Sequence, residues 1–172
     1  YYKVYLSEYD VTTEIAPTDR CAYFRFTFPK ADDSYVVVDA FDRASWVKVL
    51  PEENTVVGYS TRNSGGVTSN YRNFFVIQFD KPFADARVWD KYEIRNGKKE
   101  VGGEHAGAAI GFKTAKGEKI CAKVATSFVS LDQAYHNLKE LDGKDFEQTK
   151  DEAKAQWNKI LGAIDVESDN VD

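Results

Sequence analysis

The alternation of hydrophobic and polar positions changes its period near residue 130. Up to Val129, apolar residues mostly recur at every second position, the spacing of strands that bury one face. The run CAYFRFTFP at 21–29 is an example, because it is apolar at every second position from Ala22 to Phe28 and is closed by Pro29. From Ser130 onward, apolar residues are spaced by three and four, as in amphipathic helices. The pattern therefore predicts a β-rich segment followed by a helical one.

Several further runs before residue 130 predict strands separated by turn residues. They are YYKVYL (1–6), DVTTEIAPT (10–18), SYVVVDAF (34–41), SWVKVL (45–50), TVVGYS (55–60), NFFVIQF (73–79) and ARVWDKYEI (86–94). The runs at 35–38 and 73–79 are apolar on both faces and predict central strands. PEEN at 51–54 predicts a hairpin turn, and 107–129 predicts a last hairpin that turns at Lys116–Gly117. About ten strands without alternating helices predict an antiparallel β-sandwich.

Two helices are predicted after the strands. Ser130 with Gln133 forms a capping box, and Asp145 with Gln148 marks a second start after Gly143. The apolar stripe of the first helix is Leu131, Ala134, Tyr135 and Leu138, and that of the second is Phe146, Ala153, Trp157, Ile160, Leu161 and Ile164. We therefore predict a mainly β fold with two C-terminal α-helices, a β-sandwich domain at 1–129 and a helical segment at 130–172.

Length and charge limit the function classes. The 172 residues suffice for one domain with a substantial core and are too few for two ordinary ones. The net charge of −5 argues against nucleic-acid binding, because no basic stripe is available to displace phosphate counterions. No apolar run approaches the roughly 20 residues that cross a bilayer. The chain contains no Met and begins at Tyr1, so we expect a processed chain or a fragment.

The two cysteines, Cys21 and Cys121, both fall inside predicted strands. Their separation leaves open whether they form the one bridge that two thiols allow. Two buried or half-buried thiols are the interpretation we favour over a disulfide.

The reactive side chains do not fall into a catalytic or metal-binding spacing. No HExxH, CxxC, EF-hand loop or nucleophile elbow occurs. Asp39 and Asp42 suggest a metal corner or an acid pair, but strand-end polarity explains them better. His105, in GGEHAGA, is more simply a surface-loop histidine. From the residues alone we name no catalytic and no metal-binding residue.

One long polar loop, RNSGGVTSN at 62–70, is a candidate for sugar contact. Aromatic faces stack on sugar C–H surfaces, and amide and guanidinium groups bind hydroxyls, so the candidate carbohydrate-binding residues are Trp46, Tyr59, Arg62 and Asn63. A plain long turn is the simpler alternative.

Several segments, in order along the chain, resemble the N-terminal domain of glycoside hydrolase family 92, the bacterial α-mannosidases. The segments are YYKVYLSEYDVTTEIAPTDRCAYFRFTFP, YVVVDAF, VVGYSTRNSGG, NFFVIQFDKPF, VATSFVSLDQAYHNL and AKAQWNKILGAIDVE. The succession of FDKPF, SFVSLDQA and WNKIL is the most specific part. Phe24 departs from the pattern, since many relatives have His before the Arg.

The resemblance implies a β-sandwich of the supersandwich type, then linker helices, then an (α/α)6 catalytic barrel that would begin after Asp172. The implied activity is calcium-dependent, inverting exo-hydrolysis of α-mannosides, typically α-1,2 links of N-glycans. The acid, the base and the Ca²⁺ ligands are expected in the barrel, and a glycine-rich sugar-lining segment upstream of Tyr1. No catalytic residue is therefore carried onto this chain.

The implied partners are α-mannoside glycans and the missing catalytic domain, and the implied location is the bacterial periplasm, the cell surface or the medium. We expect the chain to help frame the sugar site and to be inactive alone. Two rival hypotheses are a free-standing carbohydrate-binding β-sandwich module and a purely structural adhesin-like or immunoglobulin-like domain. The hypothesis of a purely structural domain does not explain the two predicted helices.

Overall fold

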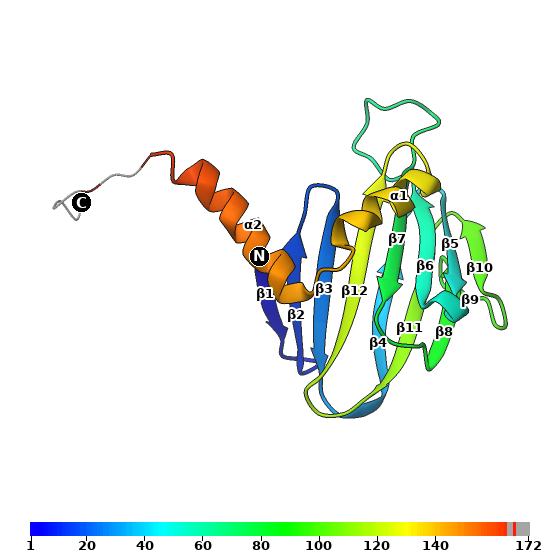
Figure 1. Ribbon diagram of the computed structural model, residues 1–172. Coiled ribbons are helices and arrows are strands. Elements are labelled where there is room, and N and C mark those ends of the chain that lie inside the picture. Colours follow the sequence, from blue (N-terminus) through cyan, green and yellow to red (C-terminus); the bar gives the residue numbers. More distant parts are fainter. Residues whose placement is uncertain (165–166, 168–172) are drawn as a thin grey trace.

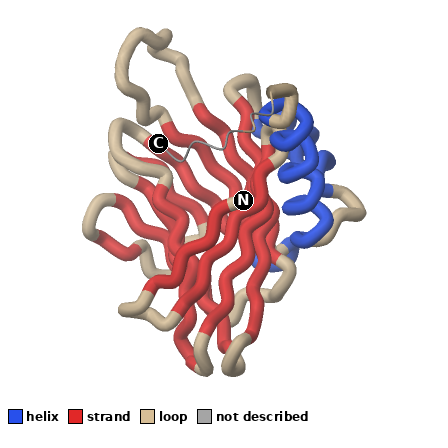
Figure 2. The backbone as a smooth tube through the Cα atoms, turned by 90° about the vertical axis from the view of Figure 1, so that its left-hand side faces the viewer, coloured by secondary structure: helices blue, strands red, loops and turns tan. Residues whose placement is uncertain are grey.

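The chain forms two stacked antiparallel sheets, with two helices on the outer face of the larger sheet (Figures 1 and 2). The computed structural model describes residues 1–164 and Glu167. The larger sheet contains, in spatial order, β1 (Tyr2–Leu6), β2 (Val11–Pro17), β3 (Cys21–Phe28), β12 (Glu118–Ser127), β7 (Asn73–Phe79), β6 (Thr55–Ser60), β5 (Ser45–Leu50) and β10 (Glu100–Gly103). The smaller sheet contains β4 (Ala31–Asp39), β11 (Ala106–Thr114), β8 (Asp85–Asp90) and β9 (Glu93–Ile94). The predicted antiparallel sandwich is confirmed.

The helical segment consists of α1 (Leu131–Leu138), the 3₁₀ turn η2 (Lys139–Leu141) and α2 (Phe146–Leu161), and a further 3₁₀ turn, η1 (Pro51–Glu53), joins β5 to β6. The two predicted C-terminal helices are therefore confirmed, but α2 ends at Leu161, so Ile164, expected on its apolar stripe, lies beyond the helix. The part of the predicted helical segment at 165–166 and 168–172 lies outside the described residues. Within the described residues, no helix combines the length and the apolar character that crossing a bilayer requires.

The main core lies between the two sheets. Val47, Val49 and Val56 of the larger sheet and Val88 and Ile110 of the smaller sheet are all at most 1% exposed. Because strand side chains alternate between faces, burying Val47 and Val49 places the intervening residues of β5 on the opposite, outer face. The predicted alternation of apolar and polar positions thus becomes an inner and an outer face.

A second, smaller core lies between the outer face of the larger sheet and the helices. It joins Val57, Val76 and Ala125 of the sheet to Leu138 and Leu141 of the helical segment. The helical segment is therefore packed on the sandwich and is continuous with its hydrophobic interior. In Figure 2 both helices lie on the same side of the strands.

Two predictions of strand placement are wrong. SYVVVDAF was expected to be central, but β4 is an edge strand of the smaller sheet, and Val37 is 63% exposed. The expected hairpin at 107–129 does not form, since β11 pairs with β4 and β8 whereas β12 pairs with β3 and β7. Gly117, at φ 78°, does reverse the chain there, but the reversal carries it from one sheet to the other. Turn chemistry specifies a change of direction and does not specify the partner strand.

Each predicted capping box is only half formed. The Ser130 side chain accepts a hydrogen bond from the amide of Gln133 at 3.0 Å, and Asp145 accepts one from the amide of Gln148 at 2.8 Å. The side chain of Gln133 instead donates to Asn137. Both helices begin where the caps predict, because one capped amide is enough to mark the start.

Both cysteines are free thiols, as the favoured interpretation held. The Sγ of Cys21 donates to the carbonyl oxygen of Asn137 at 3.0 Å. Burial raises the pKa of Cys21 and of Cys121 to about 11, so both thiols stay protonated and unreactive near neutral pH.

Candidate functional site

The polar residues singled out in the sequence gather at one end of the sandwich. There, the segment after β4 (40–44), the long loop between β6 and β7 (61–72) and the turn between β10 and β11 come together; the long loop projects at the top of Figure 1.

The segment 40–44 is held in an uncommon backbone conformation. Phe41, Arg43 and Ala44 have φ of 69°, 69° and 71°, in the left-handed region that residues other than glycine rarely adopt. Hydroxyl groups hold it there: Ser45 donates to the carbonyl oxygen of Phe41 at 2.8 Å, and Thr61 donates to those of Arg43 and Ala44. The amide of Ala106 donates to the Ser45 oxygen at 2.8 Å, which ties the segment to β11.

The two aspartates of this segment each pair with a basic side chain. Asp39 lies 2.7 Å from the Nε2 of His105, and Asp42 lies 2.5 Å from a guanidinium nitrogen of Arg62. The Arg62 guanidinium lies 5.3 Å from the ring centre of Phe41, and the His105 ring lies 5.9 Å from it. Strand-end polarity thus describes both aspartates better than an acid pair.

A metal site is not formed by this cluster. Across residues 1–164 and Glu167, no three His, Cys, Asp or Glu side chains come together in a way that could hold a metal ion.

A shallow pocket of about 260 Å³ lies against the long loop. Its lining residues are mostly polar and include Arg43, Thr61, Asn63, Ser69 and Tyr71. The Asn63 side chain donates to the carbonyl oxygen of Thr61 at 2.9 Å and accepts from the amide of Gly65 at 2.8 Å. Asn63 therefore shapes the loop as well as lining the pocket. Hydroxyl, amide and guanidinium groups in this arrangement suit a polyhydroxylated ligand.

Trp46 and Tyr59 occupy a different place, on the outer face of the larger sheet. They are cross-strand partners, and their rings stack with centroids 5.9 Å apart. The Trp46 indole donates to Glu100 at 2.9 Å, and the Arg72 guanidinium lies 5.1 Å from the centre of the Tyr59 ring. Hydrogen bonding from Trp46 and Lys48 holds the pKa of Glu100 below its usual range.

The structure thus divides the four predicted sugar residues into two sets, Trp46 with Tyr59 and Arg62 with Asn63. Residues that sequence reasoning missed include Phe41, Arg43, Arg72 and Phe74, whose ring meets Tyr59 edge-on at 5.9 Å. Phe74 is the cross-strand partner of Tyr59 across β6 and β7. The long loop separates β6 from β7 in the sequence. The register with which these two strands pair, and not any local pattern, makes Phe74 a neighbour of Tyr59.

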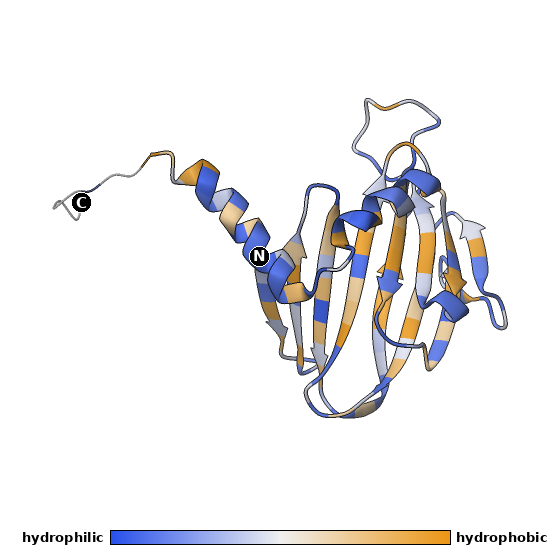
Figure 3. Cartoon of the chain, in the orientation of Figure 1, coloured by the Kyte–Doolittle hydropathy of each residue, from blue (hydrophilic) through white to orange (hydrophobic). Residues whose placement is uncertain are grey.

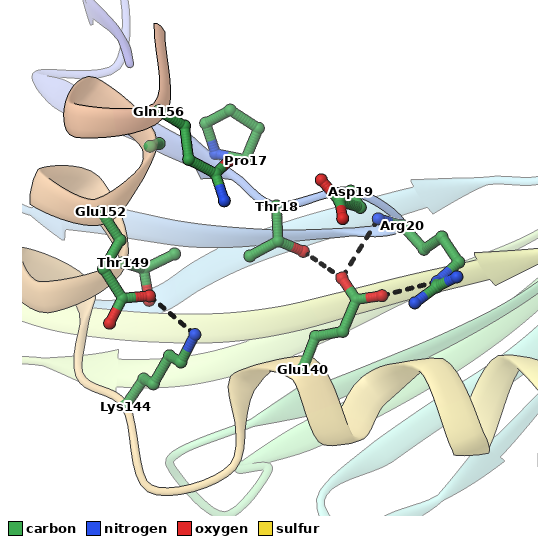
Figure 4. A pocket seen from close by; sticks show the side chains of 10 residues that line it. Pro17, Thr18, Asp19, Arg20, Glu140, Lys144, Thr149, Glu152 and Gln156 are labelled. Atoms are coloured by element: carbon green, nitrogen blue, oxygen red, sulfur yellow. Dashed lines mark hydrogen bonds and ion pairs between the residues drawn. The ribbon is translucent and has the colours of Figure 1, made fainter. Parts of the chain in front are cut away.

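A second polar cleft, of about 200 Å³, separates the β2–β3 turn from the helical segment (Figure 4). On one side, Glu140 accepts hydrogen bonds from the Thr18 hydroxyl at 2.6 Å, the Arg20 amide at 3.2 Å and the Arg20 Nε at 2.6 Å. On the other side, Lys144 reaches Glu152 at 2.7 Å. Burial by itself would raise the pKa of Glu140, but the bonds from Thr18 and Arg20 outweigh it and hold that pKa below its usual range. The bonds from Thr18 and Arg20 to Glu140 cross from the β2–β3 turn to the helical segment, so this cleft is a joint between the sandwich and the helices.

Known proteins share this fold. The family model for the glycosyl hydrolase family 92 N-terminal domain matches residues 1–127. Among solved structures, the family GH92 inverting mannosidase BT2199 of Bacteroides thetaiotaomicron VPI-5482 is 30% identical, with a TM-score of 0.92 over 98% of this chain and 23% of that chain. The family GH92 α-mannosidase BT3965 of the same species, in complex with mannoimidazole, is 26% identical, with a TM-score of 0.85 over 98% and 23% of the two chains. No curated protein matches.

This chain therefore spans about a quarter of the length of the solved mannosidases that it matches. The match to the family model covers well over half of its residues, and the sandwich is reproduced in enzymes of one family. The chain belongs to glycosyl hydrolase family 92, and residues 1–127 are its N-terminal domain.

Proposed function

We propose that this chain is the N-terminal part of an inverting exo-α-mannosidase that acts on α-mannosides of N-glycans. The observation that carries the proposal is the 0.92 TM-score to an inverting mannosidase over 98% of this chain, at 30% identity. The loop end of the sandwich, with its polar pocket, helps to frame the sugar site. The acid, the base and the Ca²⁺ ligands belong to the catalytic barrel of the parent polypeptide, outside this chain. The parent enzyme works in the bacterial periplasm, at the cell surface or in the medium.

The first test is hydrolysis. We expect this chain, incubated with α-1,2-mannobiose and Ca²⁺, to release no mannose above a control without protein, because the proposal assigns the acid, the base and the Ca²⁺ ligands to the catalytic barrel and not to this chain. The parent polypeptide should release mannose with inverted anomeric configuration, which proton NMR follows directly. Turnover by this chain alone, or retention by the parent, would contradict the proposal.

The second test concerns the sugar-contacting residues. We propose that Arg62 and Asn63 contact the glycan from the loop end, and Trp46 and Tyr59 from the outer face. In the parent enzyme, Arg62→Ala and Trp46→Ala should each raise KM for an N-glycan substrate by about tenfold, the cost of one lost polar or stacking contact. Arg87→Ala serves as the control, since Arg87 is an exposed residue of β8, in the other sheet. Unchanged KM in both test variants would remove these residues from the proposal.

The free-standing binding module remains the rival, and calorimetry separates the two. We expect no measurable heat when mannose is titrated into this chain. Binding that Arg62→Ala abolishes would favour the module instead.

A further inference from the structure

The outer face of the smaller sheet carries no helix within the described residues. Both helices pack on the larger sheet, on the far side of the sandwich (Figure 2). Residues alternate between the two faces along each strand, and Figure 3 shows the resulting change between apolar and polar colours along the strands. In β11, Ile110 is buried in the main core. Between 107 and 111, the outer face of β11 therefore consists of Gly107, Ala109 and Gly111.

Two aromatic rings lie over the two glycines. A side chain added at Gly107 would collide with the indole of Trp89, the cross-strand partner of Gly107 on β8. One added at Gly111 would come within 2.9 Å of the ring of Tyr35, its partner on β4. The two rings thus reach over β11 from its two neighbouring strands, and both remain partly exposed. Their positions define a line along β11.

The two rings are the ends of a flat surface. Gly107 and Gly111 are four residues apart, which is about 13 Å along a strand. Ala109 lies between them, and its short side chain keeps the surface between the rings low. A ligand touches both rings only if it is extended over about this length. We call Trp89, Ala109 and Tyr35 the aromatic platform.

The charged groups beside the aromatic platform are paired. Asp85, which accepts a hydrogen bond from the Tyr35 hydroxyl at 3.2 Å, lies 2.8 Å from a guanidinium nitrogen of Arg87. At the other end, Asp39 lies 2.7 Å from the Nε2 of His105. A surface whose charges are paired exerts little net field, so it favours a neutral ligand over an anionic polymer.

A neutral, extended ligand that packs on aromatic rings is a chain of sugars. The C–H faces of sugar rings stack on aromatic faces, and a chain of about three sugar units reaches over a distance of about 13 Å. A single sugar touches only one of the two rings. Calorimetry with mannose should therefore show no measurable heat, even when the aromatic platform binds a longer chain.

We propose that the aromatic platform binds one chain of a neutral polysaccharide, an α-mannan, along β11. The smaller sheet carries this site, whereas Trp46 and Tyr59 belong to the larger sheet, so the site holds the protein on a polymer without taking part in cleavage. The choice of mannan rests on the proposed function, but the geometry of the aromatic platform does not.

Native gel electrophoresis of this 172-residue chain, with and without soluble α-mannan in the gel, tests the proposal. The mannan should retard the native chain. Trp89→Ala combined with Tyr35→Ala should raise the dissociation constant at least about tenfold, the effect of lost stacking contacts. Unchanged migration of the native chain in mannan, or equal retardation of the native chain and the double variant, would overturn the proposal.

Matched variants separate stacking from folding. Trp89→Phe combined with Tyr35→Phe keeps a ring over each glycine and should keep most of the retardation. Ala109→Gln keeps both rings but fills the surface between them, so it should weaken binding even if the alanine pair does not fold. Tyr92→Ala removes a fully exposed ring from the turn between β8 and β9 and should change nothing. Equal losses in Ala109→Gln and Tyr92→Ala, or retardation unchanged in Ala109→Gln, would contradict the proposal.

Further measurements distinguish other ligands and partners. Stronger retardation by polygalacturonate, an anionic polysaccharide, than by α-mannan would overturn the preference for a neutral chain. Sedimentation of the native chain should show a monomer. A dimer that the alanine pair dissociates would make a second copy the partner and would also overturn the proposal.

Mannose release from α-1,2-mannobiose by the parent polypeptide tests the proposed function separately. The alanine pair should leave this activity unchanged, because the aromatic platform lies on the other sheet from Trp46 and Tyr59. Mannan binding by this chain, with a parent that does not cleave mannosides, would contradict the proposed function and keep the aromatic platform. Cleavage by the parent without mannan binding by this chain would do the reverse.

Discussion

Arg25, in the middle of β3, lies between the larger sheet and helix α2. Its guanidinium forms two hydrogen bonds with the Glu14 carboxylate, at 2.7 and 2.9 Å, and a third with Glu147. The side chains of Arg25 and Glu14 are only 11% and 7% exposed, so this pair is largely removed from water. Removing one partner of such a pair leaves the other charge buried without a counter-charge, and this penalty is the main effect of the pair on stability.

Arg25→Ala should lower the free energy of unfolding by about 3–5 kcal/mol, because it leaves the buried Glu14 carboxylate without its cation. Urea denaturation measures the change. Arg87→Ala is the control: the Arg87–Asp85 pair has side chains 53% and 41% exposed, and its loss should cost about 0–1 kcal/mol. Equal costs for the two variants would show that burial of the Arg25 pair contributes nothing.

The Glu14 carboxyl should also make stability depend on pH. Hydrogen bonds from Arg25, opposed by burial and aided by Tyr1, lower its pKa from 4.5 to about 2. In the unfolded chain the carboxylate takes up its proton near the ordinary value, whereas in the folded chain it stays ionised until about pH 2. Its contribution is therefore complete above 4.5 and is lost as the pH falls toward 2.

The stability lost between about pH 7 and about pH 3 should accordingly be smaller in Glu14→Gln than in the native chain, although Glu14→Gln is less stable at pH 7. Urea midpoints at both pH values give the comparison. The other carboxyl groups titrate in both proteins and cancel in the difference. An unchanged pH dependence would mean that another carboxyl group is responsible.

At the scale of elements, the link between the sandwich and α2 depends on a short 3₁₀ turn, η2. Glu140 in this turn is held by Thr18 and Arg20, and the following residue, Leu141, is fully buried. Lys123 of β12 donates to the Leu141 carbonyl oxygen at 2.8 Å. The helical segment is thus attached through its connecting turn as well as through its helices.

Glu140→Ala should cost about 1–3 kcal/mol and raise the hydrogen exchange rates of the first turn of α2, because three hydrogen bonds to the β2–β3 turn are lost. The exchange of the central strands should not change. Glu152→Ala, which removes an exposed pair with Lys144, provides the comparison and should cost less than about 1 kcal/mol. If both variants leave the amides of α2 equally protected from hydrogen exchange, the bonds of Glu140 to the β2–β3 turn do not hold the helix.

At the scale of the whole molecule, the larger sheet is covered on both faces, by the smaller sheet on one and by the helices on the other. The two cores should therefore respond differently to truncation. Ile110→Ala and Leu141→Ala each remove a fully buried side chain and should each cost about 2–5 kcal/mol. Hydrogen exchange should then speed up in both sheets for Ile110→Ala, but chiefly in α1 and α2 for Leu141→Ala. Identical exchange patterns would indicate one cooperative unit with no separable helical layer.

Sequence pattern determined the parts of this fold that depend on neighbouring residues. Phe24, Phe26 and Phe28 face the main core because strand side chains alternate between faces. Both helices begin after Ser130 and Asp145 because each of these residues caps an amide three residues on. The pairing of Trp46 with Tyr59 also follows from the short PEEN turn. The family itself could be recognised from motifs in their order along the chain.

Only the tertiary structure decided which strands share a sheet and which side chains meet. Three consecutive valines in β4 indicate a strand but do not specify an edge, and a glycine turn at 117 does not specify whether β11 and β12 pair. Likewise, Asp42 pairs with Arg62, and Glu140 bonds with Thr18. The partners are far apart in the sequence, so no local pattern predicts these contacts. The sequence by itself determined the elements and the family, since local propensity and periodicity act over a few residues. The site, the joint and the aromatic platform were decided by long-range packing, which depends on the whole chain at once.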